Sequence, residues 1–369
     1  MSNNSSLFFW RGIYGSEEKT ETVTNFLILM GSFLILLAAV YLFLASPVDK
    51  NDHDDIEIVV PSGTGVTGIA KILKENDLIR SEMLFTITVK SKGDLYLQAS
   101  TYLFRRDMSM EDIISELVSG SKYNPDAITI TFKEGMRITD YASEIAKATN
   151  HSETEVLNTL NDSTFLETLR KKYWFLTDSI LQEGIYYPLE GYLAPDTYQF
   201  DNKDVSISTI IETMLDEMEK ELEPYRTQIQ NNVHYYMTMA SLVELEGTNT
   251  ENRKMIAGIF ENRIAANMNL GSDVTTYYAL QFPMTSDLTT AQFATVNPYN
   301  TRAANMRGQM PIGPICNPSL SSLKASIEPT DSDYLYFVAD KNGNIFYTNT
   351  LAEHEAMVQE IKDKGDWIW

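Results

Sequence analysis

An uncharged and almost wholly apolar stretch, from Phe26 to Ala45, constrains this chain more than any other feature. At about 20 residues it has the length that a helix needs to cross a bilayer. The alternatives are a buried helix or a cleaved signal peptide, but the stretch is long for a signal and lacks a convincing cleavage pattern. We therefore expect one uncleaved transmembrane helix over residues 25–46, preceded by a short polar tail over residues 1–24.

The residues that flank this stretch predict its orientation. Arg11 and Lys19 precede it, whereas only Lys50 follows it closely. The positive-inside rule then favours a cytoplasmic N-terminus, a single pass through the cell membrane and an extracytoplasmic remainder. The one cysteine, Cys316, excludes an internal disulfide, which fits a bacterial envelope protein that does not depend on disulfides.

Composition narrows the class of protein. Of 369 residues, 43% are hydrophobic and 22% charged, which is typical of a folded chain with two or more domains. The net charge of −22 argues against a nucleic-acid partner, since phosphate neutralisation needs basic patches and none is evident. The four histidines are scattered and form no HExxH pattern, so we expect neither a metal site nor a cofactor.

A repeated pattern follows a linker at residues 47–55. Residues 56–60 alternate like a strand, Gly63 turns the chain, and residues 66–70 open an amphipathic helix. The same residue types recur about 72 positions later, around Gly135, which indicates a duplicated strand–helix unit. Between the copies, Leu84 to Val89 alternates like a further strand, and Ser109 is placed to cap a helix. We expect an α+β fold, with a small αβ module at 56–120 and a mixed α+β catalytic domain at 121–369.

Within the larger domain, periodicity and capping signals predict the order of elements. Gly247 should end one helix, and Thr248 with Glu251 should form a capping box for the next, which runs to about Asn267. Asn342-Gly343 should be a hairpin turn between two strands. The expected helices cover 137–180, 205–223, 224–246 and 248–267, and the expected strands cover 334–339 and 344–347.

The segment Ala240 to Gly247 contains the clearest candidate for a catalytic residue. It places Glu244 on a mostly apolar helical stretch, ahead of a run rich in Asn, Pro, Gly and Tyr. A carboxyl that is partly shielded from water has a raised pKa and can hold a proton near neutral pH. Such an acid can protonate the leaving oxygen of a glycosidic bond. Glu246 points to a different face of the helix, so the two acids cannot both aim at one bond.

A conventional glycosidase needs a second carboxyl across the bond, and the sequence does not single one out. Glu251 is better explained as a helix cap, and Asp273 as a loop hydrogen-bonder. The Asn-rich loops fit either a sugar site or plain turn structure. The candidates for the second carboxyl are Glu190, Asp196, Glu251, Asp273 and Asp287. The candidates for substrate binding are Glu190, Asn297, Tyr299, Asn300 and Asn317.

Several segments, in order, resemble motifs of the YceG-like family of endolytic murein transglycosylases. Leu189 to Tyr198 resembles EGfLfPDTY, Ala240 to Glu246 resembles ASIvEkE, and Ile259 to Arg263 resembles vFxNRL. Counterparts also exist for 298–301, 313–318, 334–340 and the pair Glu353-His354. The chain departs from the family pattern at Gly271, Val274, 309–312 and Arg302, which affects the lining of the sugar groove and leaves Glu244 untouched.

The resemblance implies that Glu244 is the catalytic acid of a lytic transglycosylase. Such an enzyme cleaves the MurNAc–GlcNAc bond of peptidoglycan strands and leaves 1,6-anhydroMurNAc ends. The resemblance also implies that residues 56–120 form a LysM-like module that contacts glycan strands, and that cell-wall synthases are partners. Two rival hypotheses stay open: a muramidase that uses Glu244 with Glu190 or Asp273, and a non-catalytic scaffold that binds peptidoglycan and recruits synthases.

Overall fold

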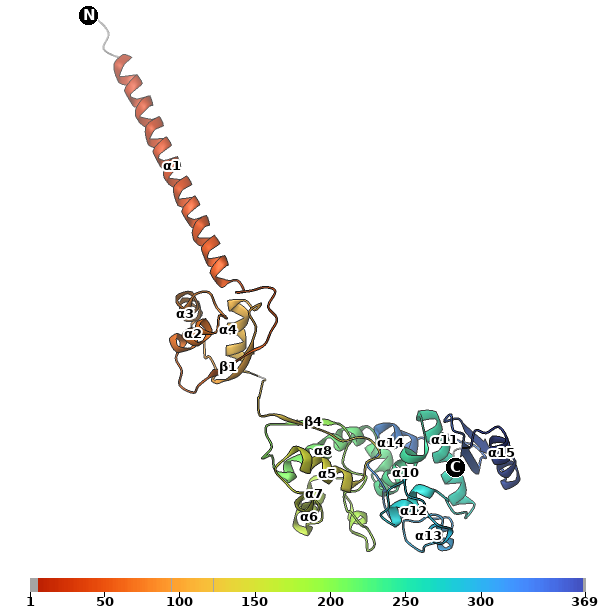
Figure 1. The fold of residues 1–369 in the computed structure, drawn as a ribbon. Coiled ribbons are helices and arrows are strands. Elements are labelled where there is room, and N and C mark those ends of the chain that lie inside the picture. Colours follow the sequence, from red (N-terminus) through yellow and green to blue (C-terminus); the bar gives the residue numbers. More distant parts are fainter. Residues whose placement is uncertain (1–5, 94, 122, 368–369) are drawn as a thin grey trace, which may run out of the picture. The chain divides into compact units, whose positions relative to one another are not determined.

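The structure is a computed structural model that describes residues 6–93, 95–121 and 123–367. It divides into two compact units, Met1–Pro125 and Asp126–Trp369. Helices dominate both units, and the strands of the described residues pair into small antiparallel sheets (Figure 1). The mixture of helices and separate small sheets is that of an α+β chain, as expected.

The first unit begins with a single long helix, α1 (Ser6–Ala45). Its segment Thr24–Ala45 has a mean hydropathy of 2.7 over its most apolar window, and none of that window is buried against the protein. This part of the helix is long and apolar enough to cross a membrane, as the sequence predicted. The helix extends further toward the N-terminus than the apolar stretch that identified it.

The small module after α1 is a two-stranded sheet covered by three helices. Strands β1 and β2 pair antiparallel, with Ile58 opposite Tyr102. The predicted cap of its last helix is confirmed, because Ser109 and Asp112 form a reciprocal capping box. The elements are β1 (Ile56–Val60), α2 (Val66–Glu75), α3 (Glu82–Ser91), β2 (Ser100–Phe104) and α4 (Met110–Ser119).

The strand predicted at Leu84 to Val89 is wrong, since these residues belong to helix α3. Ser81 caps this helix by accepting a hydrogen bond from the backbone N–H of Leu84. Phe85, Thr88 and Val89 are buried, and their spacing is that of one helix face. The β-branched residues of this segment alternate along the sequence, but the window is too short to distinguish the two-residue period of a strand from the 3.6-residue period of a helix. Strand β2, which the sequence analysis missed, takes the place beside β1.

The second unit opens with the second copy of the repeat. Strand β3 (Ile128–Thr131) and helix α5 (Ile138–Ala148) stand about 72 residues after β1 and α2, so the repeated strand–helix order is confirmed. β3 pairs antiparallel with β4 (Thr197–Phe200). Ser152 and Glu155 form a reciprocal capping box at the start of the following helix. Helix α5 contacts β3, and further helices contribute side chains to the same hydrophobic core. These are α6 (Glu153–Leu160), α7 (Ser163–Lys172), η1 (Asp178–Leu181) and α8 (Ile207–Leu222).

The rest of the unit is built around the buried helix α10 (Val233–Glu246), which contacts α11, α12 and α14 (Figure 1). The single helix expected at 224–246 is broken into three pieces. Gly247 ends α10 as predicted, but the capping box of Thr248 and Glu251 is wrong. Asn249 caps α11 instead, by accepting from the backbone N–H of Asn252.

The hairpin predicted around Asn342-Gly343 is confirmed by the antiparallel pair β5–β6. The elements of this part are η2 (Glu223–Tyr225), α9 (Arg226–Ile229), α11 (Thr250–Ala265), α12 (Asp273–Ala279), α13 (Thr290–Phe293), η3 (Ala304–Met306), α14 (Leu320–Ile327), β5 (Tyr336–Ala339), β6 (Ile345–Thr348) and α15 (Leu351–Asp363).

Candidate active site

Helix α10 holds Glu244 in its last turn, and its buried length fixes where that turn lies. Met237 to Val243 are all buried, so the helix has no solvent face over these residues. The hydroxyl of Ser241 accepts a hydrogen bond from the backbone N–H of Ile315 at 3.1 Å. This contact ties the helix to the segment that leads into α14 and keeps the end of α10 from shifting.

The carboxylate of Glu244 is clamped between two neighbouring helices. Its side chain is 5% exposed. Nη2 of Arg253, on α11, donates to Oε1 at 2.7 Å. The backbone N–H and the hydroxyl of Ser319 donate to Oε2 at 2.8 Å and 2.6 Å. A fourth contact closes the clamp, because Nη1 of Arg253 donates to the Ser319 hydroxyl at 3.2 Å.

Ser319 also caps a helix, and this second role explains its position. It is the N-cap of α14, and its hydroxyl accepts from the backbone N–H of Ser322 at 3.2 Å. Glu244 therefore lies at the N-terminus of α14, where free N–H groups favour a negative charge. One serine both starts a helix and positions the carboxylate.

Two glycines leave the space that this arrangement needs. A Cβ on Gly247 would lie 2.6 Å from Cγ of Arg253 and 3.1 Å from its Cα. Gly135 has a φ of +77°, and a Cβ there would lie 3.3 Å from Cδ2 of Leu245 and 3.8 Å from Cγ of Glu244. The turn between β3 and α5 thus passes directly against the residues at the end of α10. Its close approach is held by a hydrogen bond from Gly135 N–H to the carbonyl of Asn317 at 2.8 Å.

Glu190 lies in the interior and is 1% exposed. Its oxygens accept from the backbone N–H of Ile138 at 3.0 Å and from the hydroxyl of Tyr278 at 3.0 Å. Burial raises the pKa of Glu190 to about 8, against the opposing effect of these hydrogen bonds. A carboxyl so enclosed links the start of α5 to α12 rather than facing an open groove.

The remaining predicted substrate-binding residues also connect loops. Asn317 is buried and receives hydrogen bonds on Oδ1 from the N–H groups of Gly191 and Leu193. Asn300 is buried, and its Oδ1 accepts from the hydroxyl of Thr276 at 2.7 Å. These contacts hold the Asn-rich loops against the helices. Whether any of these side chains also contacts a sugar stays a prediction.

A cluster of aromatic rings brings two more of the predicted residues together with Glu190. Tyr299 lies 4.9 Å from the ring of Tyr186 and 4.8 Å from the ring of Tyr278, between ring centroids. Asn297 donates to the hydroxyl of Tyr186 at 2.7 Å. Because Tyr278 donates to Glu190, three chain segments meet in one network at this cluster.

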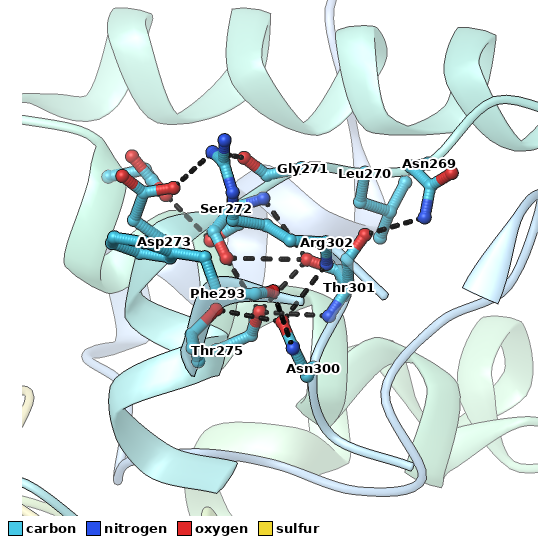
Figure 2. A network of polar contacts seen from close by, with 12 residues as sticks. Asn269, Leu270, Gly271, Ser272, Asp273, Thr275, Phe293, Asn300, Thr301 and Arg302 are labelled. Carbon is cyan, nitrogen blue, oxygen red and sulfur yellow. Dashed lines mark hydrogen bonds and ion pairs between the residues drawn. The ribbon is translucent and has the colours of Figure 1, made fainter. Parts of the chain in front are cut away.

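A further polar network joins the loop before α12 to the loop after Tyr299 (Figure 2). The hydroxyl of Thr301 accepts from the backbone N–H of Ser272 at 3.1 Å. It also shares a hydrogen bond of 2.9 Å with the hydroxyl of Thr275. Asn269 donates to the carbonyl of Thr301 at 3.0 Å, which adds another contact between the two loops.

Glu246 is attached to this network, on the other side of the α10 terminus from Glu244. The hydroxyl of Ser272 donates to its Oε1 at 2.6 Å. Burial raises the pKa of Glu246, and the hydrogen bond from Ser272 opposes that effect. Arg302 pairs with Asp273 and donates to the carbonyl of Gly271 at 3.3 Å (Figure 2). Two positions at which the chain departs from the family pattern, Gly271 and Arg302, are therefore in contact.

The two residues that hold Glu244 were not predicted from the sequence. Arg253 lies nine positions after Glu244, and nothing in its local pattern separates it from a surface arginine. Ser319 had a usable signal, because a serine directly after Pro318 and before a helical stretch is typical of an N-cap. In the described part of the chain, hydrogen bonds and ion pairs bring neither Asp196, Glu251, Asp273 nor Asp287 to Glu244.

Comparisons with known proteins agree with the motif pattern. The YceG-like family model matches residues 58–360. A Bacillus subtilis protein named endolytic murein transglycosylase is 38% identical over 88% of this chain and 89% of its own length. A Streptococcus pneumoniae protein of the same name is 34% identical over 85% of this chain and 60% of its own length. A crystal structure of a YceG-like protein from Listeria monocytogenes is 33% identical, with a TM-score of 0.59, and covers 82% of this chain and 99% of that one.

Proposed function

The chain belongs to the YceG-like family, and we propose that it is a membrane-anchored endolytic murein transglycosylase with Glu244 as its acid and base. The observation that carries the assignment of the residue is the clamp on Glu244. Its carboxylate is nearly buried, fixed by Arg253 and Ser319, and bound to no second carboxylate among the described residues. A single fixed carboxyl suits a reaction that does not need a pair.

The proposed reaction uses this one group twice. Glu244 in its protonated form donates to the oxygen between N-acetylmuramic acid and N-acetylglucosamine, and that bond breaks. The resulting carboxylate accepts the proton of the muramoyl C6 hydroxyl, whose oxygen attacks C1 and closes a 1,6-anhydro ring. Because the attacking hydroxyl belongs to the same sugar, proximity replaces an activated water.

The clamp acts in the first half of this sequence. Arg253 and Ser319 supply three hydrogen-bond donors to the carboxylate, which is the form that Glu244 takes once it has protonated the glycosidic oxygen. Fixed donors of this kind also hold the carboxyl at one place between the two proton transfers. The donors do not themselves exchange protons with the sugar.

The setting of the reaction follows from the same proposal. Helix α1, whose segment Thr24–Ala45 is the candidate membrane span, crosses the cell membrane once with its N-terminus in the cytoplasm. The small module after α1 and the second unit then lie on the outer side. The domain limits in this proposal are 56–120 for the small module and 121–369 for the catalytic domain. The small module makes a LysM-like contact with glycan strands. Cell-wall synthases are the proposed protein partners, which crosslinking in intact cells followed by purification would test.

The decisive experiment is mass spectrometry of glycan strands digested by the full chain in detergent, beside Glu244→Gln and Glu251→Gln. The second variant removes an exposed acid on the next helix and serves as the matched control. We expect internal cuts that end in 1,6-anhydromuramic acid, lost by roughly two to four orders of magnitude in Glu244→Gln alone.

The other outcomes separate the rival hypotheses. Reducing ends in place of anhydro ends would mean hydrolysis with a second carboxyl, as in a muramidase. Full activity of Glu244→Gln would remove this residue from the mechanism. Inactivity of the wild-type chain on strands, together with binding to them, would support the scaffold.

A further inference from the structure

Helix α3 of the small module carries an apolar stripe on the side that faces away from the module. Met83 is 74% exposed and Ile87 is 56% exposed. At about 100° per residue, Met83, Ile87 and the exposed Lys90 lie within roughly 60° of one another around the helix. The buried Phe85, Thr88 and Val89 occupy the opposite side, so the stripe has no role in the core of the module.

The end of the apolar helix α1 is attached to the start of α3. The guanidinium of Arg80, directly before the cap of α3, lies over the ring of Phe43 at 4.6 Å. Its Nη2 also donates to the carbonyls of Pro47 and Val48, at 2.7 Å and 2.9 Å. Helices α1 and α3 are in direct contact (Figure 1).

The segment between α1 and the module is held at further points. The backbone N–H of Asp49 donates to the carbonyl of Arg106 at 3.0 Å, and the Arg106 guanidinium pairs with Asp52 at 2.8 Å. His53 contacts Asp107 at 2.7 Å. Ala45 itself packs against the core of the module. The linker predicted at 47–55 is therefore attached to the module at several points along its length.

The length of the apolar segment places this attachment at the membrane surface. Its 22 residues, Thr24–Ala45, span roughly 33 Å, which matches a hydrocarbon core of about 30 Å. Phe43 then lies near the outer edge of the core, and Arg80 lies at the level of the lipid headgroups. From that point α3 extends by about 8 Å to Ile87, which stays within reach of the interface.

We propose that the stripe of Met83 and Ile87 inserts at the boundary between headgroups and acyl chains of the membrane that α1 crosses. This rests on the anchoring role proposed for α1. The occupant is the lipid surface, because α3 starts against the end of the helix that enters it. Lys90, in line with the two apolar residues, reaches the lipid phosphates by extending its apolar stem along the interface. The module thereby lies on the membrane by a fixed face, and its other faces stay available to glycan strands.

The test measures the surroundings of single labelled positions in the full chain. An environment-sensitive fluorophore is attached to Ile87→Cys, and to Ser115→Cys on the exposed side of α4 as the control. The native Cys316 is buried and does not compete for the label. The protein is placed in bilayer nanodiscs of phosphatidylethanolamine and phosphatidylglycerol, with and without lipids that carry a shallow nitroxide on the acyl chain.

We expect the probe at position 87 to emit at shorter wavelength than the probe at 115, and to be quenched severalfold more by the nitroxide lipids. Equal quenching at both positions, with α1 retained in the membrane after alkaline carbonate washing, would overturn the lipid-facing stripe and leave the anchor standing. A blue shift at 87 without nitroxide quenching would also overturn it, because the probe would then contact protein. Release of the chain by carbonate would overturn both the anchor and the stripe.

Discussion

Arg253 and Glu244 form an ion pair of 2.7 Å between Nη2 and Oε1, joining the end of α10 to the first turns of α11. The two side chains are 13% and 5% exposed, so the pair is largely withdrawn from water. Breaking such a pair by removing one partner leaves an uncompensated charge, whereas an exposed pair contributes little. The position of the Glu244 carboxylate therefore depends on Arg253.

Replacing Arg253 should reduce the rate more than it reduces glycan binding. Arg253→Lys keeps a positive charge but loses the second arm that reaches Ser319, so we expect kcat to fall by up to about 10²-fold with little change in KM. Arg253→Met should lose more activity and also stability. Lys254→Met is the matched control, because it removes the neighbouring charge, which pairs with Glu328 instead. Turnover of Arg253→Lys equal to that of the control variant would show that the clamp has no catalytic value.

The double task of Ser319 predicts a loss of stability and of activity together. Ser319→Ala removes the cap of α14, which costs about 1 kcal/mol, and removes one donor to Glu244. Ser319→Thr keeps the hydroxyl and should retain most of both. Ser206 caps α8 through Thr209 and does not contact Glu244, so Ser206→Ala should lose similar stability at full activity. Denaturant unfolding and glycan-strand cleavage, measured on the same preparations, check these expectations. Equal losses of activity in Ser319→Ala and Ser206→Ala would attribute the lost activity to helix capping alone.

The order of elements in this chain was predictable where a local signal determined it. Ser109 and Ser152 mark helix starts, because a serine followed three residues later by an acid satisfies free N–H groups wherever the helix packs. The strand prediction for Leu84 to Val89 was wrong because Ser81, which lies outside the alternating window, starts a helix there. The prediction of the cap of α11 was wrong because Asn249 lies between Thr248 and Thr250. Composition does not say which of these three capping residues is used.

The candidate site was predictable only in part, for a different reason. Glu244 stood out because an acid on an apolar helix is unusual. Its partners come from segments 9 and 75 residues away, and such contacts depend on how α11 and α14 pack. Burial of Glu190 was equally hidden, since it follows from the fit of Ile138 and Tyr278 around it.

The two copies of the repeat supply a matched pair of glycines for testing the approach to Glu244. Gly135 has a φ of +77° and Gly63, its counterpart, a φ of +81°, so alanine at either position adopts a disfavoured backbone conformation at a cost of about 1 kcal/mol. A Cβ at Gly63 meets nothing within 4 Å, whereas a Cβ at Gly135 presses on Leu245 beside Glu244. We expect similar losses of stability from Gly63→Ala and Gly135→Ala, and a loss of cleavage from Gly135→Ala only. Cleavage by Gly135→Ala at the wild-type rate would mean that the turn does not position the acid.

The pKa of Glu190, raised to about 8 from a usual 4.5 by burial, predicts how stability changes with pH. Between these two values the unfolded chain has lost the proton that the folded chain keeps, so rising pH favours unfolding. The contribution of this residue to the free energy of unfolding should fall by about 1.4 kcal/mol per pH unit in that window and level off above about pH 8. Glu190→Gln cannot ionise and should lack this component.

The measurement compares urea unfolding of the wild-type chain and Glu190→Gln between pH 5 and pH 8. Half-buried Glu221, whose pKa is raised to about 7 by burial, adds a similar slope to both proteins, so the difference between the curves isolates Glu190. That difference should shift in favour of Glu190→Gln as pH rises, since the glutamine keeps an oxygen for the N–H of Ile138 at every pH. Glu251→Gln, at an exposed position, should follow the wild-type curve. Parallel curves for wild type and Glu190→Gln would mean that Glu190 is ionised in the folded protein and that Tyr278 and Ile138 stabilise its charge.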